Sequence, residues 1–86
     1  MTRVPQPEGE VFGRRLRELR LKAGLTQDAL AQAAGMTKPY ISNMEHGINV
    51  PSLTTILRLA VSLGCRVTAL TSVFDKVEDL EGLLPK

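Results

Sequence analysis

The sequence predicts an all-α domain of five short helices, and three observations support that prediction. Apolar residues recur at spacings of three and four along most of the chain, which is the period of an amphipathic helix. Ser and Thr residues that favour helix starts alternate with glycines that favour helix ends. The length of 86 residues suits one domain with a small core, so self-association would add stability.

The composition excludes several classes of protein. Hydrophobic residues make up 43% of the chain, which favours a folded protein, and no apolar run approaches the length of a membrane span. Residues 1–10 hold no apolar stretch of the kind found in a signal peptide, so a cytoplasmic protein is expected. Cys65 is the only cysteine, His46 is the only histidine, and the sequence has no Gly-rich phosphate loop. We therefore expect no metal, no cofactor, no membrane association and no enzymatic activity.

Charge is distributed unevenly along the chain. Residues 1–66 carry nine Lys and Arg against five Asp and Glu, a balance of +4, whereas residues 67–86 carry two against four, a balance of −2. A basic body favours a polyanion as one partner, and an acidic tail favours a protein as another. Charge alone fits an ordinary mixed-charge surface equally well.

Residues 1–9 contain two prolines and no apolar period, so they are expected to form a flexible arm. Arg3 is the only cation in this arm, which favours a loose tail over an arm that contacts a polyanion. The first helix is predicted at residues 10–23 and ends at Gly24. Its apolar stripe consists of Phe12, Leu16, Leu19 and Ala23.

The second helix is predicted at residues 27–34. Thr26 precedes it as an N-cap, and Asp28 places a negative charge in the first turn, where the helix dipole favours it. Gly35 ends the helix, because glycine readily adopts the left-handed conformation that follows many helices.

The third helix is predicted at residues 38–46, with Thr37 as its N-cap. Pro39 falls in the first turn, where its missing N–H would have no helical partner anyway. Ile41 and Met44 are expected to face the core, which leaves a polar face exposed on the other side. Two short helices joined by a Gly-containing turn form a helix-turn-helix unit. The alternative is an ordinary surface helix in a small bundle.

Two further helices complete the predicted domain. Ser52 is the expected N-cap of the fourth helix, and Gly64 ends it. The expected core face of this helix consists of Leu53, Ile56, Leu57, Ala60 and Leu63. The fifth helix is predicted from residue 66 to about residue 74, and Thr68 offers an alternative start.

The domain is predicted to cover residues 10–72, and residues 73–86 form an extension that remains apolar. A short exposed apolar segment on a small domain is typical of an interface, so we assign this extension to homodimerisation. The alternative is that it packs back on its own domain. The expected interface residues are Val73, Phe74, Val77, Leu80, Leu83 and Leu84.

The order and spacing of the motifs across residues 12–70 resemble the Cro/repressor-type helix-turn-helix of the XRE family. The matching residues are Gly24-Leu25-Thr26-Gln27, Leu30-Ala31, Gly35, Tyr40-Ile41-Ser42, Glu45, Gly47, Pro51-Ser52-Leu53, Leu59-Ala60 and Leu63-Gly64. The resemblance implies a five-helix lambda-repressor-like DNA-binding domain, similar to small phage-type repressors and restriction–modification controller proteins. It implies a homodimeric regulator, repressor or autoregulatory controller, whose recognition helix at residues 38–46 enters the major groove of a pseudo-palindromic operator.

The resemblance also implies roles for individual residues. The residues expected to read bases are Lys38, Pro39, Tyr40, Ser42 and Asn43. Among them Asn43 is the best direct reader, because an amide can pair with adenine through two hydrogen bonds. The residues expected to contact phosphates are Gln27, Thr37, His46 and Asn49. Arg20 and Glu45 are expected to form an ion pair, the alternative being a solvent-exposed Arg20.

A second functional class remains open at this point. An antitoxin-type protein would bind a partner protein through its tail and regulate its own operon through the same helix-turn-helix. The tail is short for that role, which ranks this alternative second. The sequence does not determine the operator or the choice between repression and activation. It also does not identify a protein partner such as a polymerase or a toxin.

Overall fold

The computed structural model describes residues 5–76 and 80–85, and all regular elements in these residues are helical. The elements are α1 (Pro7–Lys22), α2 (Gln27–Ala34), α3 (Lys38–Glu45), α4 (Leu53–Leu63), α5 (Val67–Thr71), and the 3-10 turns η1 (Ser72–Phe74) and η3 (Glu81–Leu83). The prediction of an all-α domain with five helices is therefore confirmed. Within the described residues no single helix is long and apolar enough to cross a membrane. Leu53–Leu63 and Val67–Phe74 have that length and apolar character only when they are taken together, and a bend of 117° separates them.

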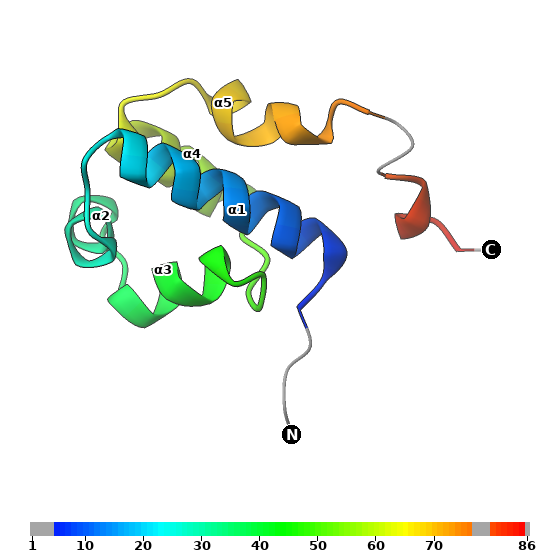
Figure 1. Cartoon of the computed structure of the whole chain (residues 1–86), viewed down its shortest axis with the longest axis horizontal. Coiled ribbons are helices and arrows are strands. Elements are labelled where there is room, and N and C mark those ends of the chain that lie inside the picture. The colour runs from blue at the N-terminus through cyan, green and yellow to red at the C-terminus, as the bar shows by residue number, and fades with distance from the viewer. Residues whose placement is uncertain (1–4, 77–79, 86) are drawn as a thin grey trace.

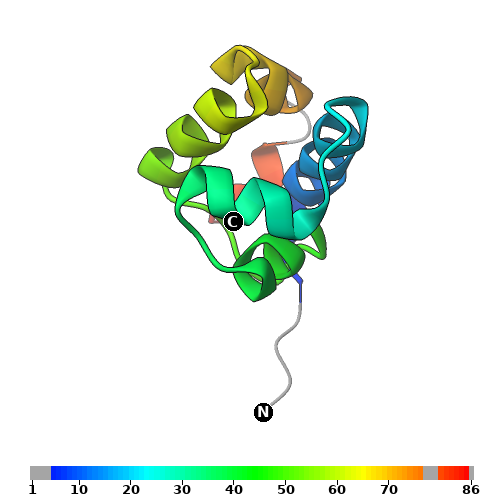
Figure 2. The ribbon, with the colours of Figure 1, turned by 90° about the vertical axis from the view of Figure 1, so that its left-hand side faces the viewer.

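The helices pack around α1, which runs through the middle of the view in Figure 1. Below it lies α3, behind it α4, and across the top α5, while α2 closes one end of the molecule (Figures 1 and 2). Of the helix pairs in contact, α1 and α3 share the most extensive packing, followed by α2 with α3 and α2 with α4. The helix-turn-helix formed by α2 and α3 is thus held from two sides, by α1 and by α4.

One hydrophobic core joins all five helices. Its buried residues are Phe12, Leu16, Leu30, Ala31, Ala34, Ile41, Met44, Leu59, Ala60 and Leu70. The predicted inward positions of Ile41 and Met44 are confirmed, since both side chains are fully buried. Ala23, which was expected to extend the stripe of α1, is exposed, because α1 ends at Lys22 and the chain turns away after it.

Helix starts and stops follow the predicted capping residues closely. Thr26, Thr37 and Ser52 each accept a hydrogen bond from the backbone N–H three residues later, at 3.0, 3.3 and 3.2 Å. Gly35 and Gly64 end α2 and α4 in the left-handed conformation, with φ of 69° and 65°. Capping side chains and terminal glycines therefore determine the boundaries of these helices.

The start of α1 differs from the prediction, because the helix begins at Pro7 instead of residue 10. Proline suits the first helical position, and Glu8 adds a favourable charge in the first turn. The backbone N–H of Gln6 donates to the carbonyl of Gly47 at 3.2 Å, which ties the chain before α1 to the loop after α3. Part of the expected arm thus belongs to the folded domain, while residues 1–4 lie outside the described residues.

The predicted core face of α4 is wrong in part. Leu53 is 70% exposed and Leu57 is 44% exposed, whereas Leu59, which was not assigned to the core, is fully buried. Ala60 is buried as expected, and Ile56 packs partly against the core. Thr54, Thr55, Arg58 and Ser62 share one side of α4, but the apolar residues cover the wide arc that remains, so their period does not decide which part of that arc is buried. Packing against α2 and α5 selects the face that carries Leu59.

The fifth helix is shorter than predicted and continues as the 3-10 turn η1. It begins at Val67 after Arg66, whose side chain makes no capping hydrogen bond, and Thr68 lies within the helix instead of capping it. Leu70 is the buried residue of α5 and joins it to the core.

The C-terminal extension divides into two parts. Phe74 is half-buried and packs partly against the core of its own domain, as in the alternative of internal packing, so only part of its side chain remains available to a dimer interface. Val73 is half-buried, and Val77 lies outside the described residues. The apolar residues that remain exposed are Leu80, Leu83 and Leu84.

Candidate nucleic-acid interface

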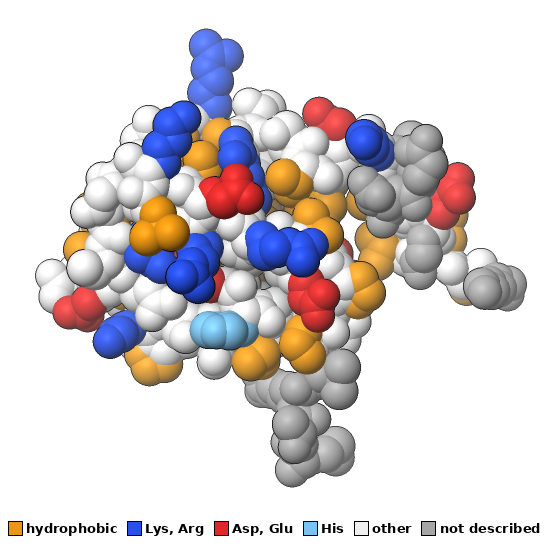
Figure 3. All heavy atoms as spheres, in the orientation of Figure 1, with side chains coloured by type: hydrophobic (Ala, Val, Ile, Leu, Met, Phe, Trp, Pro, Cys, Tyr) orange, Lys and Arg blue, Asp and Glu red, His pale blue; other side chains and the backbone are white. Residues whose placement is uncertain are grey.

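One face of α3 points to solvent and carries polar groups. Lys38 and Pro39 at its start are exposed, while Ser42 and Asn43 in its middle are half-buried. The opposite face consists of buried residues, so the solvent-facing side chains are not needed to hold the helix in place. Lys and Arg side chains lie over the middle of the view in Figure 3, where α1 runs above α3, and Asp and Glu side chains are interspersed with them. A polyanion that approached α3 would therefore also meet positive charge.

Tyr40 occupies the edge of this face, on the side toward α4. Its ring is half-buried and packs against the core, and its hydroxyl lies 3.5 Å from the hydroxyl of Thr55. The structure thus places Tyr40 between α3 and α4.

The starts of α2 and α3 present hydrogen-bond donors to solvent. Thr37 uses its side-chain oxygen to accept the bond from the Tyr40 N–H, so its hydroxyl proton remains able to donate. The first N–H groups of each helix have no helical acceptor, and the helix dipole favours an anion there. Both features suit the binding of a phosphate group.

A buried ion pair holds the end of α3 to the end of α1, as the family resemblance implies. The Nε of Arg20 donates to Glu45 Oε2 at 2.6 Å, and its Nη2 donates to Oε1 at 3.0 Å. The two side chains are only 8% and 2% exposed. The remaining nitrogen of Arg20, Nη1, donates to the carbonyl of Leu25 at 2.9 Å. The hydrogen bond to Glu45 raises the pKa of Arg20 above its ordinary value, although burial opposes that shift.

Gln27 joins the same network, which was not expected from the sequence. Its Nε2 donates to Glu45 Oε1 at 3.1 Å. A glutamine amide has two N–H donors, so one can hold Glu45 while the other faces a phosphate. No local pattern links Gln27 to Glu45, because the contact depends on how α2 crosses α3.

Two glycines of α1 allow the backbone of α3 and the loop after it to come close. A Cβ atom on Gly9 would lie 2.7 Å from the carbonyl oxygen of Gly47. A Cβ atom on Gly13 would overlap the carbonyl oxygen of Met44 and would lie 2.6 Å from that of Glu45. Real Cβ atoms do not approach backbone oxygens this closely, so glycine is required at both positions. Neither glycine could be singled out from the sequence, because a glycine within a helix predicts only lower helix propensity.

His46 and Asn49 follow α3 and lie at its C-terminal end. His46 is exposed, and its Nδ1 lies 2.7 Å from the carbonyl oxygen of Ser42, which orients the ring. A neutral imidazole that donates through Nδ1 can only accept at Nε2, so His46 needs a second proton to donate to a phosphate. Asn49 is half-buried, and its backbone N–H donates to the carbonyl of Asn43 at 3.3 Å. Across the described part of the chain, no three His, Cys, Asp or Glu side chains lie close enough to hold a metal ion.

Residues 11–71 match a protein family described as a helix-turn-helix domain. The chain belongs to this helix-turn-helix family. The structure resembles the crystal structure of the restriction-modification controller protein C.AhdI from Aeromonas hydrophila, with a TM-score of 0.73. The two sequences are 38% identical, and the match covers 76% of this chain and 98% of that chain. The expected Cro/repressor type of helix-turn-helix is thereby confirmed.

Curated relatives of this helix-turn-helix protein are transcriptional regulators. The propionyl-CoA carboxylase regulator of Cereibacter sphaeroides is 45% identical over 60 residues, which are 70% of this chain and 13% of that protein. The HTH-type transcriptional regulator DdrOP3 of Deinococcus deserti is 45% identical over 53 residues, which are 62% of this chain and 41% of that protein. The chain spans less than half the length of these two relatives. DNA binding in transcription regulation is the function common to the family, and the relatives are regulatory proteins rather than enzymes.

Proposed function

We propose that the protein is a homodimeric, sequence-specific regulator that places α3 in the major groove of a pseudo-palindromic DNA operator. The observation that carries this proposal is the division of α3 into two faces. Ile41 and Met44 are fully buried on one face, and the other face presents hydrogen-bonding side chains to solvent. The major groove admits an α-helix and displays a distinct pattern of donors and acceptors for each base pair.

Base reading is assigned to four side chains on the outer face of α3. Asn43 reads adenine through its amide, and Lys38 donates to a guanine or to a phosphate. Pro39 has no donor, so its contribution is apolar contact, for instance with a thymine methyl group. Ser42 lies beside them and can donate or accept. Tyr40, packed toward α4, contributes at the edge of the interface.

Phosphate contacts are assigned to the ends of the two helices. Gln27 and Thr37 bind phosphates at the starts of α2 and α3, where the helix dipole assists them. His46 and Asn49 contact the backbone beyond the end of α3. Such contacts set the position of the protein on DNA without reading its sequence, and cationic contacts to phosphates weaken as salt concentration rises.

Dimerisation is assigned to the exposed part of the C-terminal extension. One recognition helix contacts only a few base pairs, whereas a two-fold dimer reads two half-sites about 34 Å apart. Leu80, Leu83 and Leu84 expose apolar surface that a second copy can cover. The likeness to C.AhdI, a restriction–modification controller protein, supports a role as a repressor or autoregulatory controller.

The experiment that tests this proposal is selection of bound duplexes from a random DNA pool at near-physiological salt. We expect an enriched inverted repeat whose half-sites lie on one side of the double helix. A variant with both Ser42→Ala and Asn43→Ala should lose this enrichment. Thr68→Ala, at an exposed position on α5 away from α3, is the matched control and should select the same sequence as the wild type. A wild-type protein that enriches no sequence, and whose binding vanishes as salt rises, would contradict sequence-specific recognition.

A further inference from the structure

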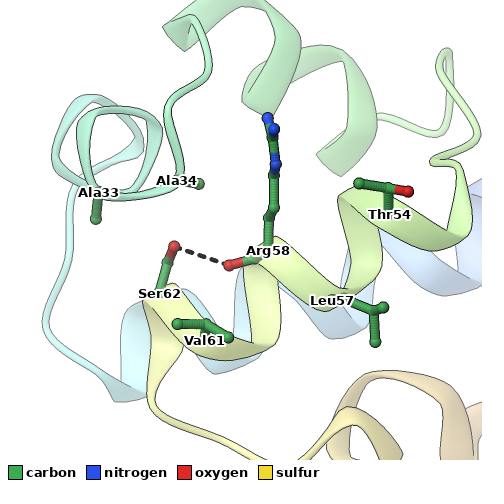
Figure 4. A pocket seen from close by; sticks show the side chains of 7 residues that line it. All are labelled: Ala33, Ala34, Thr54, Leu57, Arg58, Val61 and Ser62. Carbon is green, nitrogen blue, oxygen red and sulfur yellow. Dashed lines mark hydrogen bonds between the residues drawn. The ribbon is translucent and has the colours of Figure 1, made fainter.

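A shallow apolar groove of about 330 Å³ runs between α2 and α4. Ala33 and Ala34 form its α2 side, and α4 contributes Leu57, Arg58 and Val61 across from them (Figure 4). We call this feature the α2–α4 groove. Among the described residues, those that line the groove all belong to α2 and α4.

The α4 side of the groove continues a stripe of exposed apolar residues. Leu53, Leu57 and Val61 follow one another at intervals of four residues, so they lie along one side of the helix. They are 70%, 44% and 83% exposed, although Leu and Val are usually buried. A continuous exposed apolar surface of this kind on a small domain is typical of an interaction site.

The same chain carries a segment with matching chemistry. Leu80, Leu83 and Leu84 are 36%, 58% and 70% exposed, and Glu81 lies among them. The groove offers apolar surface and one cation, Arg58, while the segment offers apolar side chains and one anion. Both the apolar character and the charge are therefore complementary.

The segment does not reach the groove of its own copy. Figure 1 places α2, which forms one wall of the groove, at the opposite end of the molecule from the segment that contains η3. Two uncovered apolar surfaces thus remain in a single copy of the chain. A second copy can cover both at once, because a two-fold axis that brings one segment to one groove also creates the reverse contact.

We propose that residues 80–84 of one copy dock into the α2–α4 groove of a second copy, with Glu81 of the first facing Arg58 of the other. This inference rests on the proposed homodimer and names the surface that receives the C-terminal extension. None of the residues assigned to DNA contact lines the groove.

The test measures the dimer dissociation constant by sedimentation equilibrium, without DNA, on the full chain. Val61→Asp places a charge in the groove at a position that is 83% exposed, so the fold of the single copy tolerates it. We expect the dissociation constant to rise about tenfold or more. Leu21→Asp is the matched control, because Leu21 is 56% exposed on α1, outside the groove, and should leave dimerisation unchanged. Equal effects of the two substitutions would overturn the proposal.

A charge exchange tests which surfaces meet. Arg58→Glu should weaken the dimer, since it faces Glu81 with a like charge, and the double variant with Arg58→Glu and Glu81→Arg should recover most of the lost affinity. If the α4 stripes of two copies packed against each other instead, the second substitution would give no recovery, and the proposal would fail. A wild-type protein that is monomeric throughout would overturn both this contact and the proposed homodimer. A stable dimer whose dissociation constant does not change with any substitution in the groove would overturn the proposed contact but not the homodimer.

Discussion

The carboxylate of Glu45 receives two hydrogen bonds from Arg20, at 2.6 and 3.0 Å, in the interior of the domain. It also accepts a hydrogen bond from Gln27 at 3.1 Å. One side chain at the end of α3 thus fixes the end of α1 and the start of α2. The orientation of α3 relative to the rest of the domain depends on this network.

Loss of Glu45 should destabilise the domain strongly. In Glu45→Ala the guanidinium of Arg20 stays buried without its counter-ion, and removal of one partner of a buried pair costs about 3–5 kcal/mol. The measurement is the free energy of unfolding from urea denaturation monitored by circular dichroism. The control is Glu18→Ala, which breaks the pair with Arg15, where the side chains are 31% and 66% exposed. That change should cost about 0–1 kcal/mol. Equal losses would show that the buried pair does not hold α3.

A methyl group at position 13 should destabilise the domain. Helix propensity alone predicts that Gly13→Ala stabilises α1 by about 1 kcal/mol. The new Cβ would lie 2.6 Å from the backbone carbonyl oxygen of Glu45, so α1 and α3 would have to move apart. We expect a net loss of about 1–3 kcal/mol in the free energy of unfolding, as for other overpacked sites. Arg14→Ala, at the exposed neighbouring position, should change stability by less than about 0.5 kcal/mol. A gain in stability for Gly13→Ala would contradict the close helix contact.

Two leucines on α4 should respond differently to the same substitution. Leu59→Ala removes a fully buried side chain and should cost about 2–5 kcal/mol of unfolding free energy. Leu57→Ala removes a side chain that is 44% exposed and should cost about 1 kcal/mol or less. The measurement is the free energy of unfolding of both variants, from thermal or urea denaturation of the monomer at low protein concentration. The reverse order would mean that α4 turns its other side to the core.

Asn43 and Gln27 should affect DNA binding in different ways. Asn43→Ala should lose discrimination at one base position of the operator, by about 1–3 kcal/mol, because a base-reading amide is removed. Gln27→Ala should weaken all sequences alike, because phosphate contacts carry no sequence information. Affinities for the operator and for single-base variants of it, measured by fluorescence anisotropy at one fixed salt concentration, separate the two cases. Uniform weakening by both substitutions would remove Asn43 from the base-reading set.

Sequence patterns predicted the boundaries of α2, α3 and α4 well, because local chemistry determines them. Thr26, Thr37 and Ser52 form their capping bonds within three residues, and Gly35 needs no distant contact to end α2. The polar outer face of α3 could be predicted for the same reason, because the apolar positions of a short amphipathic helix show which side faces the core and which side faces solvent.

Features that depend on how helices cross could not be predicted in this way. Apolar residues cover a wide arc of α4, so only its packing decides that Leu59 is buried and Leu57 is exposed. Gly13 has no signature in its own helix, because the atoms that require it belong to α3. The contact between Gln27 and Glu45 likewise joins two helices that are distant in sequence. The ion pair of Glu45 with Arg20 was expected only because a family resemblance carried tertiary information.

The division of α3 into an inner and an outer face has a consequence for the evolution of new specificities. Ile41, Met44 and Glu45 hold the helix in place from within the protein, and none of them is available to a ligand. Substitutions at the outer positions can therefore accumulate without passing through unstable intermediates. Under the proposed function, a lineage can change its DNA target while the scaffold stays constant, and an engineer can graft the outer side chains of another regulator onto the same helix.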